Sequence, residues 1–239
     1  MHRENATCAP DYYALANGGA GGNNINPTTA ANQTITTQSS GIVFIGAGVL
    51  AQGSSRTIYV NGNVFITGDI RYAPGAYNTA DDIPSFRLIV RGNIYVHPSV
   101  TQLEGLYVAQ SDDLNNDGDV NDINFANPVA GDGQGRFYTC GNSAWAANTP
   151  SYAPNSANMV DASVNGCRGR RLTVVGAVLA EMLKLNRSLG TRSQSTAAER
   201  YNSGGNPAEV FIFSPEVWLN GDFPARGDFD SLTALPPVL

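Results

Sequence analysis

The stretches Val60-Asn61-Gly62-Asn63-Val64-Phe65-Ile66 and Val90-Arg91-Gly92-Asn93-Ile94-Tyr95-Val96 decide the fold, and they align at an offset of 30 residues. In both, branched apolar residues recur at every second position around a central glycine. That period is typical of a strand with one face in a core, whereas a helix repeats about every 3.6 residues. A glycine that recurs inside such a strand indicates a bend or the close approach of another backbone segment.

The alternation continues outward from both stretches and predicts a core face and a solvent face for each strand. The predicted core positions are Ile58, Val60, Val64, Ile66 and Ile70 in the first run and Leu88, Val90, Ile94, Val96 and Val100 in the second. The predicted solvent positions are Tyr59, Asn61, Asn63, Thr67, Asp69, Arg91, Asn93, Tyr95 and His97. Two interpretations of the aromatic residues Tyr59, Phe65, Tyr95 and Tyr107 remain open: an exposed ladder that stacks on sugars or on a neighbouring subunit, or ordinary packing beneath the N-terminal arm.

Further short runs rich in Val, Ile, Tyr and Phe predict an all-β chain. The expected strands lie within residues 42–51, 57–70, 86–100, 103–109, 136–140, 172–185 and 209–219, with inserted loops at 72–85, 111–135 and 141–166. Residues 177–189 also have near-helical spacing, but we interpret this region as a strand. We expect residues 1–40 to form an irregular arm, because they are rich in Gly, Asn and Thr, and residues 41–239 to form a single β-rich domain.

Two architectures account for the glycine-centred strands. In a parallel β-solenoid, similar to a β-helix, each glycine marks a corner and stacked coils share one continuous core. In an antiparallel β-sandwich, the glycine would lie in a hairpin turn that pairs Val60 with Val64. The solenoid is favoured because the core parity runs unbroken through Gly62 and Gly68, and the uneven glycine spacing then requires long inserted loops.

Composition limits the classes of function. The 239 residues include 14 basic and 20 acidic residues, which gives a net charge of -6, so the basic face of a nucleic-acid-binding domain is not expected. No apolar run approaches the roughly 18 residues that a membrane-spanning helix needs. The two histidines and the absence of a Ser/His/Asp spacing argue against nucleophilic hydrolysis, so we do not expect an enzyme.

The three cysteines suggest one disulfide. Cys140 ends a predicted strand and Cys167 follows a turn signal, so a bridge between them would close a loop rich in Ser, Ala, Asn and Pro. Two buried free thiols are the alternative. Cys8 then has no evident partner within the chain, which leaves pairing with another chain open.

An acidic stretch within 113–124 predicts a calcium site. Oxygen-bearing side chains occupy loop positions one, three, five and nine, and Gly118 at position six permits a sharp turn, which suits the oxygen shell that Ca²⁺ requires. The motif resembles the EF-hand loop and, more closely, the dockerin loop. The resemblance implies ligation by Asp113, Asn115, Asp117, the backbone carbonyl of Asp119, and Asn121. Position twelve is Asn124 where an EF-hand has a bidentate Glu, so affinity is weaker unless Asp122 contributes. We expect a structural role for the calcium ion, and a solvated acidic turn is the alternative.

Several segments in order resemble a group of uncharacterised surface proteins of candidate-phyla bacteria. They are the Pro-Ser-Val-Thr-Gln-Leu-Glu-Gly-Leu-Tyr-Val-Ala segment at 98–109, the cysteine pair, the Leu-Thr-Val-Val-Gly-Ala segment at 172–177 and the Leu-Pro-Pro-Val-Leu ending at 235–239. Larger proteins of that group resemble secreted proteins with a pilus-accessory membrane anchor. The glycine-bent strands are also similar to the coil pattern of bactofilins, which polymerise end to end.

Taken together, these features predict an extracellular or cell-surface structural protein, stabilised by calcium, that self-associates as a homo-oligomer, filament, pilus component or surface layer. One alternative is an adhesion module that binds surface glycans or host proteins. A second is a polysaccharide-cleaving β-helix enzyme, for which a carboxylate pair such as Asp81 and Asp82 would be needed. An open solenoid end exposes unpaired strand edges, which favours stacking on another copy.

Overall fold

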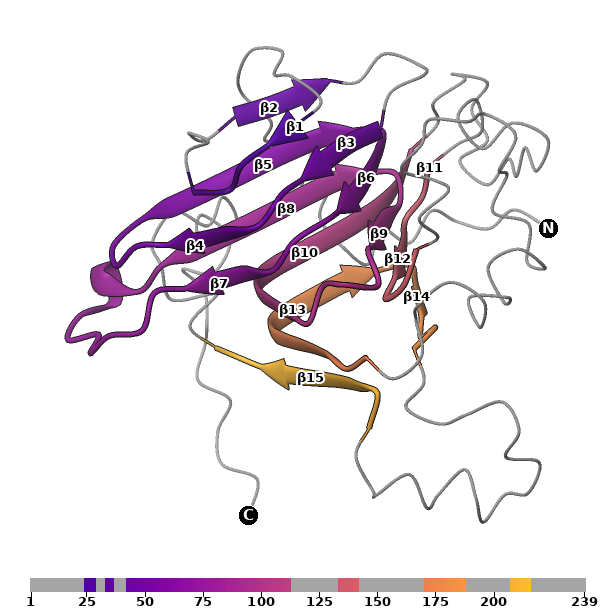
Figure 1. The fold of residues 1–239 in the computed structure, drawn as a ribbon. Helices are drawn as coiled ribbons and strands as arrows, with labels where there is room; N and C mark the ends of the chain where they lie inside the picture. Colours follow the sequence, from indigo (N-terminus) through magenta and orange to yellow (C-terminus); the bar gives the residue numbers. More distant parts are fainter. Residues whose placement is uncertain are drawn as a thin grey trace, which may run out of the picture.

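The computed structural model describes residues 24–28, 33–36, 42–112, 133–141, 170–187 and 207–215. The described chain is all-β and forms two sheets of parallel strands (Figure 1). The six-stranded sheet has the order β1 (Asn24–Ile25), β3 (Ile42–Ile45), β6 (Asn63–Ile66), β9 (Ile94–Val96), β12 (Arg136–Tyr138) and β14 (Met182–Lys184). The main path of the nine-stranded sheet is β2 (Gln33–Thr36), β5 (Ser55–Asn61), β8 (Ser85–Arg91), β10 (Gln102–Asp112), β13 (Leu172–Ala180) and β15 (Glu209–Phe213).

Shorter strands complete the second sheet. β4 (Gly48–Leu50) pairs with β7 (Ile70–Tyr72), and β7 pairs with β10, all in parallel. A 3-10 turn at Ala80–Asp82 precedes β8. β11 (Gly133–Gln134) runs antiparallel to the end of β10, and it is the exception among the strand pairs of the described residues.

The chain alternates between the two sheets. β5 and β6 are separated only by Gly62, yet β5 pairs with β8 and β6 pairs with β9. The predicted hairpin pairing of Val60 with Val64 therefore does not occur, and the antiparallel sandwich alternative is wrong for the described strands. The 30-residue offset found in the sequence is the register itself, since Val60 lies beside Val90 and Val64 beside Ile94.

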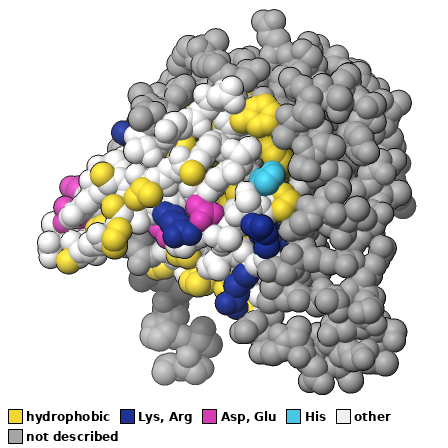
Figure 2. Space-filling view, viewed as in Figure 1, with side chains coloured by type: hydrophobic (Ala, Val, Ile, Leu, Met, Phe, Trp, Pro, Cys, Tyr) yellow, Lys and Arg dark blue, Asp and Glu magenta, His cyan; other side chains and the backbone are white. Residues whose placement is uncertain are grey.

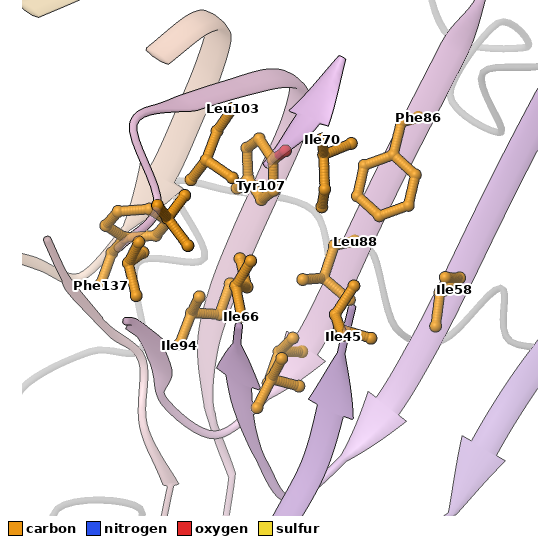
Figure 3. Packing of buried hydrophobic residues seen from close by; sticks show 14 of the residues in the cluster. Ile45, Ile58, Ile66, Ile70, Phe86, Leu88, Ile94, Leu103, Tyr107 and Phe137 are labelled. Atoms are coloured by element: carbon orange, nitrogen blue, oxygen red, sulfur yellow. The ribbon is translucent and has the colours of Figure 1, made fainter. Parts of the chain in front are cut away.

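One apolar core fills the space between the two sheets (Figure 3). The ten predicted core positions of the first two runs all belong to it, and each is fully buried. Tyr107 from β10 and Phe137 from β12 reach the same core from later strands, and their rings lie 6.1 Å apart. Burying one valine, leucine or isoleucine side chain contributes about 2 kcal/mol. The rows of buried side chains on neighbouring strands therefore hold the two sheets together.

The prediction that the other parity faces solvent is wrong over the middle of both sheets. Tyr59 packs with Ile89, Leu106 and Val108 on the second face of the nine-stranded sheet. Tyr95 stacks on Tyr138 at 4.6 Å and lies with Phe65 on the second face of the other sheet. The physical reason is that both faces of these strands are covered, as in most parallel sheets. The alternation therefore determines which of two buried layers a side chain enters, and not whether that side chain is exposed to solvent.

The exposed aromatic ladder is consequently not formed. Phe65, Tyr95 and Tyr107 are almost fully buried, and Tyr59 retains only 8% of its exposure. Gly141 contributes to this cover, because a side-chain carbon at that position would lie 2.7 Å from the Phe65 ring. These aromatic residues therefore pack against neighbouring strands in place of forming a ladder, and their cover by the N-terminal arm stays a prediction.

Two predicted solvent residues instead bridge adjacent strands where the chain changes sheet. The Asn93 backbone N–H donates to Oδ1 of Asn63 at 2.9 Å, and the Arg136 N–H donates to Oδ1 of Asn93 at 3.0 Å. Both asparagines are buried. Their amide oxygens replace water for backbone groups that the chain reversal leaves outside the regular ladder.

Glycine is required at these corners by space as well as by conformation. Gly92 has a φ of 143°, and a Cβ there would lie 2.2 Å from the carbonyl oxygen of Gly62. Gly176 differs, since it lies inside β13 directly beside Gly105 of β10, with a φ of 138°. The sequence prediction that every such glycine is a corner therefore holds for Gly62 and Gly92 but not for the later pair.

Other boundaries differ from expectation. Part of the N-terminal arm joins the sheets, since β1 pairs with β3 and β2 pairs with β5. The region with helical spacing forms β13 and β14, as the strand interpretation predicted. The last predicted strand is observed over Glu209–Phe213, and residues 216–219 lie outside the described residues.

Candidate functional site: polar turns and the C-terminal end of the sheets

The predicted calcium ligands lie outside the described residues, but the base of their loop is visible. Ser111 pairs with Gln134 and Asp112 with Gly133, so the ends of the 113–132 insertion leave the sheet side by side. The ligands Asp113, Asn115, Asp117, Asp119, Asn121, Asp122 and Asn124 all fall within that insertion. Among the described residues, no group of three or more His, Cys, Asp or Glu side chains is placed to hold a metal ion.

Cys140 follows β12, is buried, and forms a disulfide. Cys8 and Cys167 both lie outside the described residues, so the Cys140–Cys167 pairing stays a prediction.

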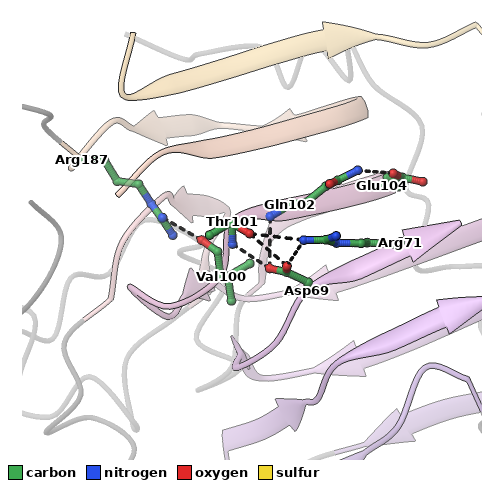
Figure 4. Close-up of polar contacts among 7 residues, drawn as sticks. All are labelled: Asp69, Arg71, Val100, Thr101, Gln102, Glu104 and Arg187. Carbon is green, nitrogen blue, oxygen red and sulfur yellow. Dashed lines mark hydrogen bonds and ion pairs between the residues drawn. The ribbon is translucent and has the colours of Figure 1, made fainter. Parts of the chain in front are cut away.

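A partly exposed carboxylate, Asp69, holds the turn between β9 and β10 (Figure 4). Oδ1 of Asp69 accepts the backbone N–H groups of Thr101 at 2.6 Å and Gln102 at 3.1 Å. Oδ2 accepts the Thr101 hydroxyl at 3.0 Å and Nη2 of Arg71 at 2.5 Å. Burial alone would raise the pKa of Asp69, but these hydrogen bonds outweigh it and lower the pKa below its usual value.

A second carboxylate continues this polar row along β10. Glu104 accepts the backbone N–H of Tyr72 at 2.7 Å through Oε2, and its Oε1 accepts the Gln102 side-chain amide. The Tyr72 hydroxyl accepts the backbone N–H of Phe86 at 3.0 Å, and burial raises the pKa of that phenol. Both carboxylates therefore satisfy backbone groups of neighbouring strands, which is a structural role.

Arg187, which follows β14, is a buried cation that sequence reasoning did not identify. Its guanidinium donates to the carbonyl oxygens of Val100 at 2.7 Å, Thr139 at 2.8 Å and His97 at 3.0 Å. Its backbone N–H donates to Glu209 at 2.9 Å, and Glu209 also accepts the Thr139 hydroxyl. Burial, with a smaller contribution from Arg170, lowers the pKa of Arg187 to about 10.

Arg187 therefore joins the last strands of both sheets to the turn after β9. The hydrogen bond between Asp69 and Thr101 has one signal in the sequence. The two residues are 32 positions apart, which is close to the 30-residue offset that places neighbouring strands side by side. No comparable signal identifies Arg187, since its carbonyl partners can be any residue type.

His97 and Ser99 are the described pair that most resembles catalytic chemistry. Nδ1 of His97 lies 2.6 Å from the Ser99 hydroxyl and also accepts the Ser99 backbone N–H at 3.1 Å. This is a local turn contact between residues two apart. Burial, reinforced by Arg170 and Arg187, lowers the pKa of His97, so its neutral form is favoured. No carboxylate in the described part of the chain orients Nε2, so the pair lacks the third group of a triad.

The carboxylate pair considered for glycoside cleavage also has a local role. Oδ2 of Asp82 accepts the backbone N–H groups of Asn78 and Thr79, both at 3.0 Å, at the start of the 3-10 turn. On the face seen in Figure 2, a basic and an acidic group lie side by side near the centre, and further basic groups lie below and to the right of them.

The C-terminal end of the two sheets is different, because apolar side chains are exposed there. Six of the eight exposed large hydrophobic residues in the described part lie on or next to β14 and β15. They are Met182, Leu183, Leu185, Phe211, Ile212 and Phe213. Leu183 pairs with the core residue Phe137, and Phe211 pairs with the core residue Val174. Leu183 and Phe211 therefore continue the rows of core side chains, whereas Met182 and Ile212 lie on the opposite faces of the same strands. We call the surface formed by the six residues the C-terminal end.

Comparison with known proteins gives no matching family model, no similar curated protein and no similar solved structure. In the described part of the chain, no helix is both long enough and apolar enough to cross a membrane.

Proposed function

We propose that this chain is an extracellular or cell-surface structural protein that self-associates through the C-terminal end of its sheets. The observation that carries the proposal is the exposure of core-facing residues on the last strand of each sheet. Phe211 retains 40% of its exposure and Leu183 retains 42%, whereas Val174 and Phe137, their partners on the preceding strands, are buried. Apolar surface at a sheet edge is unfavourable in water and is the usual template for pairing with another chain.

We propose a β-solenoid as the architecture. Support comes from the repeated passage of the chain from the six-stranded to the nine-stranded sheet, as in β6–β8, β9–β10 and β12–β13, with parallel pairing at every step. The single core between the sheets and the bridges through Asn63 and Asn93 are features expected of stacked coils.

Two further features support the compartment and the stability of the fold. A disulfide at Cys140 suits an oxidising environment, which favours an extracellular or surface location over the cytosol. The paired base of the 113–132 insertion suits a structural calcium site that orders a long loop. Calcium should then raise the melting temperature by several degrees and a chelator should reverse the rise. An unchanged melting curve up to millimolar calcium would contradict the calcium proposal, and Asp117→Asn provides the variant control.

We propose that the chain is not an enzyme, because Asp69, Asp82, Glu104, Glu209 and His97 each hold neighbouring backbone or side-chain groups in place. Glycan binding and polysaccharide cleavage stay predictions with less support, since the aromatic residues proposed to stack on sugars are buried. The resemblance to surface proteins of candidate-phyla bacteria likewise stays a prediction.

Sedimentation velocity over a hundredfold concentration range tests self-association. We expect the wild-type chain to shift from monomer to a larger species, and Phe213→Asp to shift that transition to higher concentration by about 30-fold. Val49→Asp is the matched control, because Val49 is also an exposed strand residue but lies far from the C-terminal end. A monomer at all concentrations would contradict the proposal.

A further inference from the structure

The turn between β9 and β10 is held by the side chain of its first residue, His97. The Ser99 backbone N–H donates to Nδ1 of His97 at 3.1 Å, and the Ser99 hydroxyl lies 2.6 Å from the same nitrogen. The Val100 N–H closes the turn by donating to the His97 carbonyl at 3.0 Å. A ring nitrogen that accepts an N–H carries no proton, so this arrangement requires a neutral His97 with its proton on Nε2.

Arg187 anchors the last strands on the same turn. Its guanidinium donates to three carbonyls of the turn, which are those of His97 at 3.0 Å, Pro98 at 3.4 Å and Val100 at 2.7 Å. Arg187 follows β14, and its backbone N–H donates to Glu209 at the start of β15. The turn that His97 stabilises therefore aligns the acceptors that hold Arg187, and through Arg187 it connects to both of the last strands.

Protonation of His97 would add a positive charge beside two others. Burial lowers the pKa of His97, and Arg170 before β13 and Arg187 after β14 lower it further. Asp69 and Glu209 act on Arg187, but no carboxylate in the described part of the chain raises the pKa of His97. The added proton would occupy Nδ1, so the hydrogen bond that holds the turn would be lost at the same time.

We infer that His97 is an acid-sensitive latch: its neutral ring holds the turn that anchors Arg187, and its protonation loosens β14 and β15 from the strands before them. The pKa of His97 is lowered in the folded chain, so its stabilising contribution is present above the usual value of 6.5. That contribution is lost as the pH falls toward the lowered folded value. The latch acts within one chain and does not depend on self-association.

Two backbone amides report on the last strands. The Asn186 N–H donates to the Thr139 hydroxyl at 2.8 Å. The Ser214 N–H donates to the Gly176 carbonyl at 3.3 Å. Because alternate residues of a parallel strand bond to the same neighbour, the Ile212 N–H also faces β13. Loosening of β14 should therefore expose the Asn186 amide, and loosening of β15 should expose the Ile212 amide.

Hydrogen exchange of the monomer at about pH 7.5 and about pH 5 tests the latch, since ordinary carboxylates stay charged over this range. After correction for intrinsic exchange rates, we expect the protection of Asn186 and Ile212 to fall about fivefold at the lower pH, as for the loss of one hydrogen bond. The Val64 N–H, which donates to the Asn93 carbonyl in the middle of the molecule, should keep its protection. Unchanged protection at Asn186 and Ile212, or an equal fall at Val64, would overturn the inference.

Three variants separate the titration of His97 from its packing. His97→Asn supplies an Oδ1 acceptor for the N–H two residues further on but cannot be protonated, so the fold should persist and the effect of pH should vanish. Arg170→Gln removes an exposed like charge, so the titration of the His97 ring, followed by NMR, should move to higher pH. Arg171→Gln, the exposed neighbour, should leave it in place. A pH response that persists in His97→Asn, or a His97 titration that does not respond to Arg170→Gln, would contradict the latch.

Discussion

The middle of the molecule and its C-terminal end are built from the same kind of strand but differ in what covers them. In β6 and β9, both faces are buried, so Val64 and Phe65, which point to opposite sides, are each fully inaccessible. In β15, Phe211, Ile212 and Phe213 are exposed on both faces. Burial in this protein therefore depends on more than the sequence of a strand. A neighbouring strand on each edge is needed to complete the columns.

The largest loss of stability is expected from a substitution in the middle of the molecule, where the packing leaves no room for an added atom. Gly92→Ala places a Cβ 2.2 Å from the Gly62 carbonyl oxygen at a φ of 143°. We expect a loss of about 4 kcal/mol in the free energy of unfolding, from strain and overpacking together, measured by urea denaturation. Gly75→Ala is the matched control, because its nearest contact would be 3.8 Å away. Equal stability of the two variants would contradict the close contact between Gly92 and the Gly62 carbonyl.

Shortening one aliphatic side chain in each region should lower stability by different amounts. Leu88→Ala removes a fully buried side chain and should cost about 3 kcal/mol. Ile212→Ala, at 49% exposure, should cost about 0.5 kcal/mol in the monomer. Chemical denaturation at low protein concentration measures both. Similar losses would mean that the C-terminal end is covered in the monomer.

Arg187 connects the two regions, and its removal should have an intermediate effect. Arg187→Met keeps much of the side-chain volume but leaves the carbonyls of Val100, Thr139 and His97 without their donor. We expect a loss of about 2 kcal/mol in the free energy of unfolding. Arg187→Lys should recover only part of it, since one ammonium group cannot reach the same set of carbonyls. Full recovery of stability by Arg187→Lys would indicate that the positive charge stabilises the fold, and not the several N–H donors of the guanidinium.

The smallest expected effect is a pH dependence at Asp69. Its pKa in the folded state is lowered, so its stabilising contribution is present above the usual value of 3.8 and is lost as the pH falls through the folded value. Asp69→Asn should therefore cost about 1 kcal/mol at pH 7 and much less at pH 2.5. The exposed Asp81→Asn is the control. A difference that stays constant with pH would contradict the role of the charged form.

The sequence predicted the inward columns well, because alternation and the 30-residue repeat report directly on strand register. It failed for Asn63 and Tyr95, since a pattern of period two cannot say whether the second face meets water or another layer. Asp69 could have been placed from the repeat, whereas Arg187 could not, because its partners are backbone carbonyls. The apolar run Val210-Phe211-Ile212-Phe213 lacks alternation, and that irregularity was the available signal for an unusual strand end.

Hydrogen exchange at individual amides of β15, measured at low and high protein concentration, reports whether this strand edge is open in the monomer. The Ile212 N–H faces β13, so it should be protected at both concentrations, as should Val64 and Ile94 in the middle. The Phe211 and Phe213 amides, which point away from β13, should exchange quickly in the monomer and become protected only on association. Protection of Phe211 and Phe213 that does not change with concentration would contradict the claim that this end is open in the monomer and closed by a second copy.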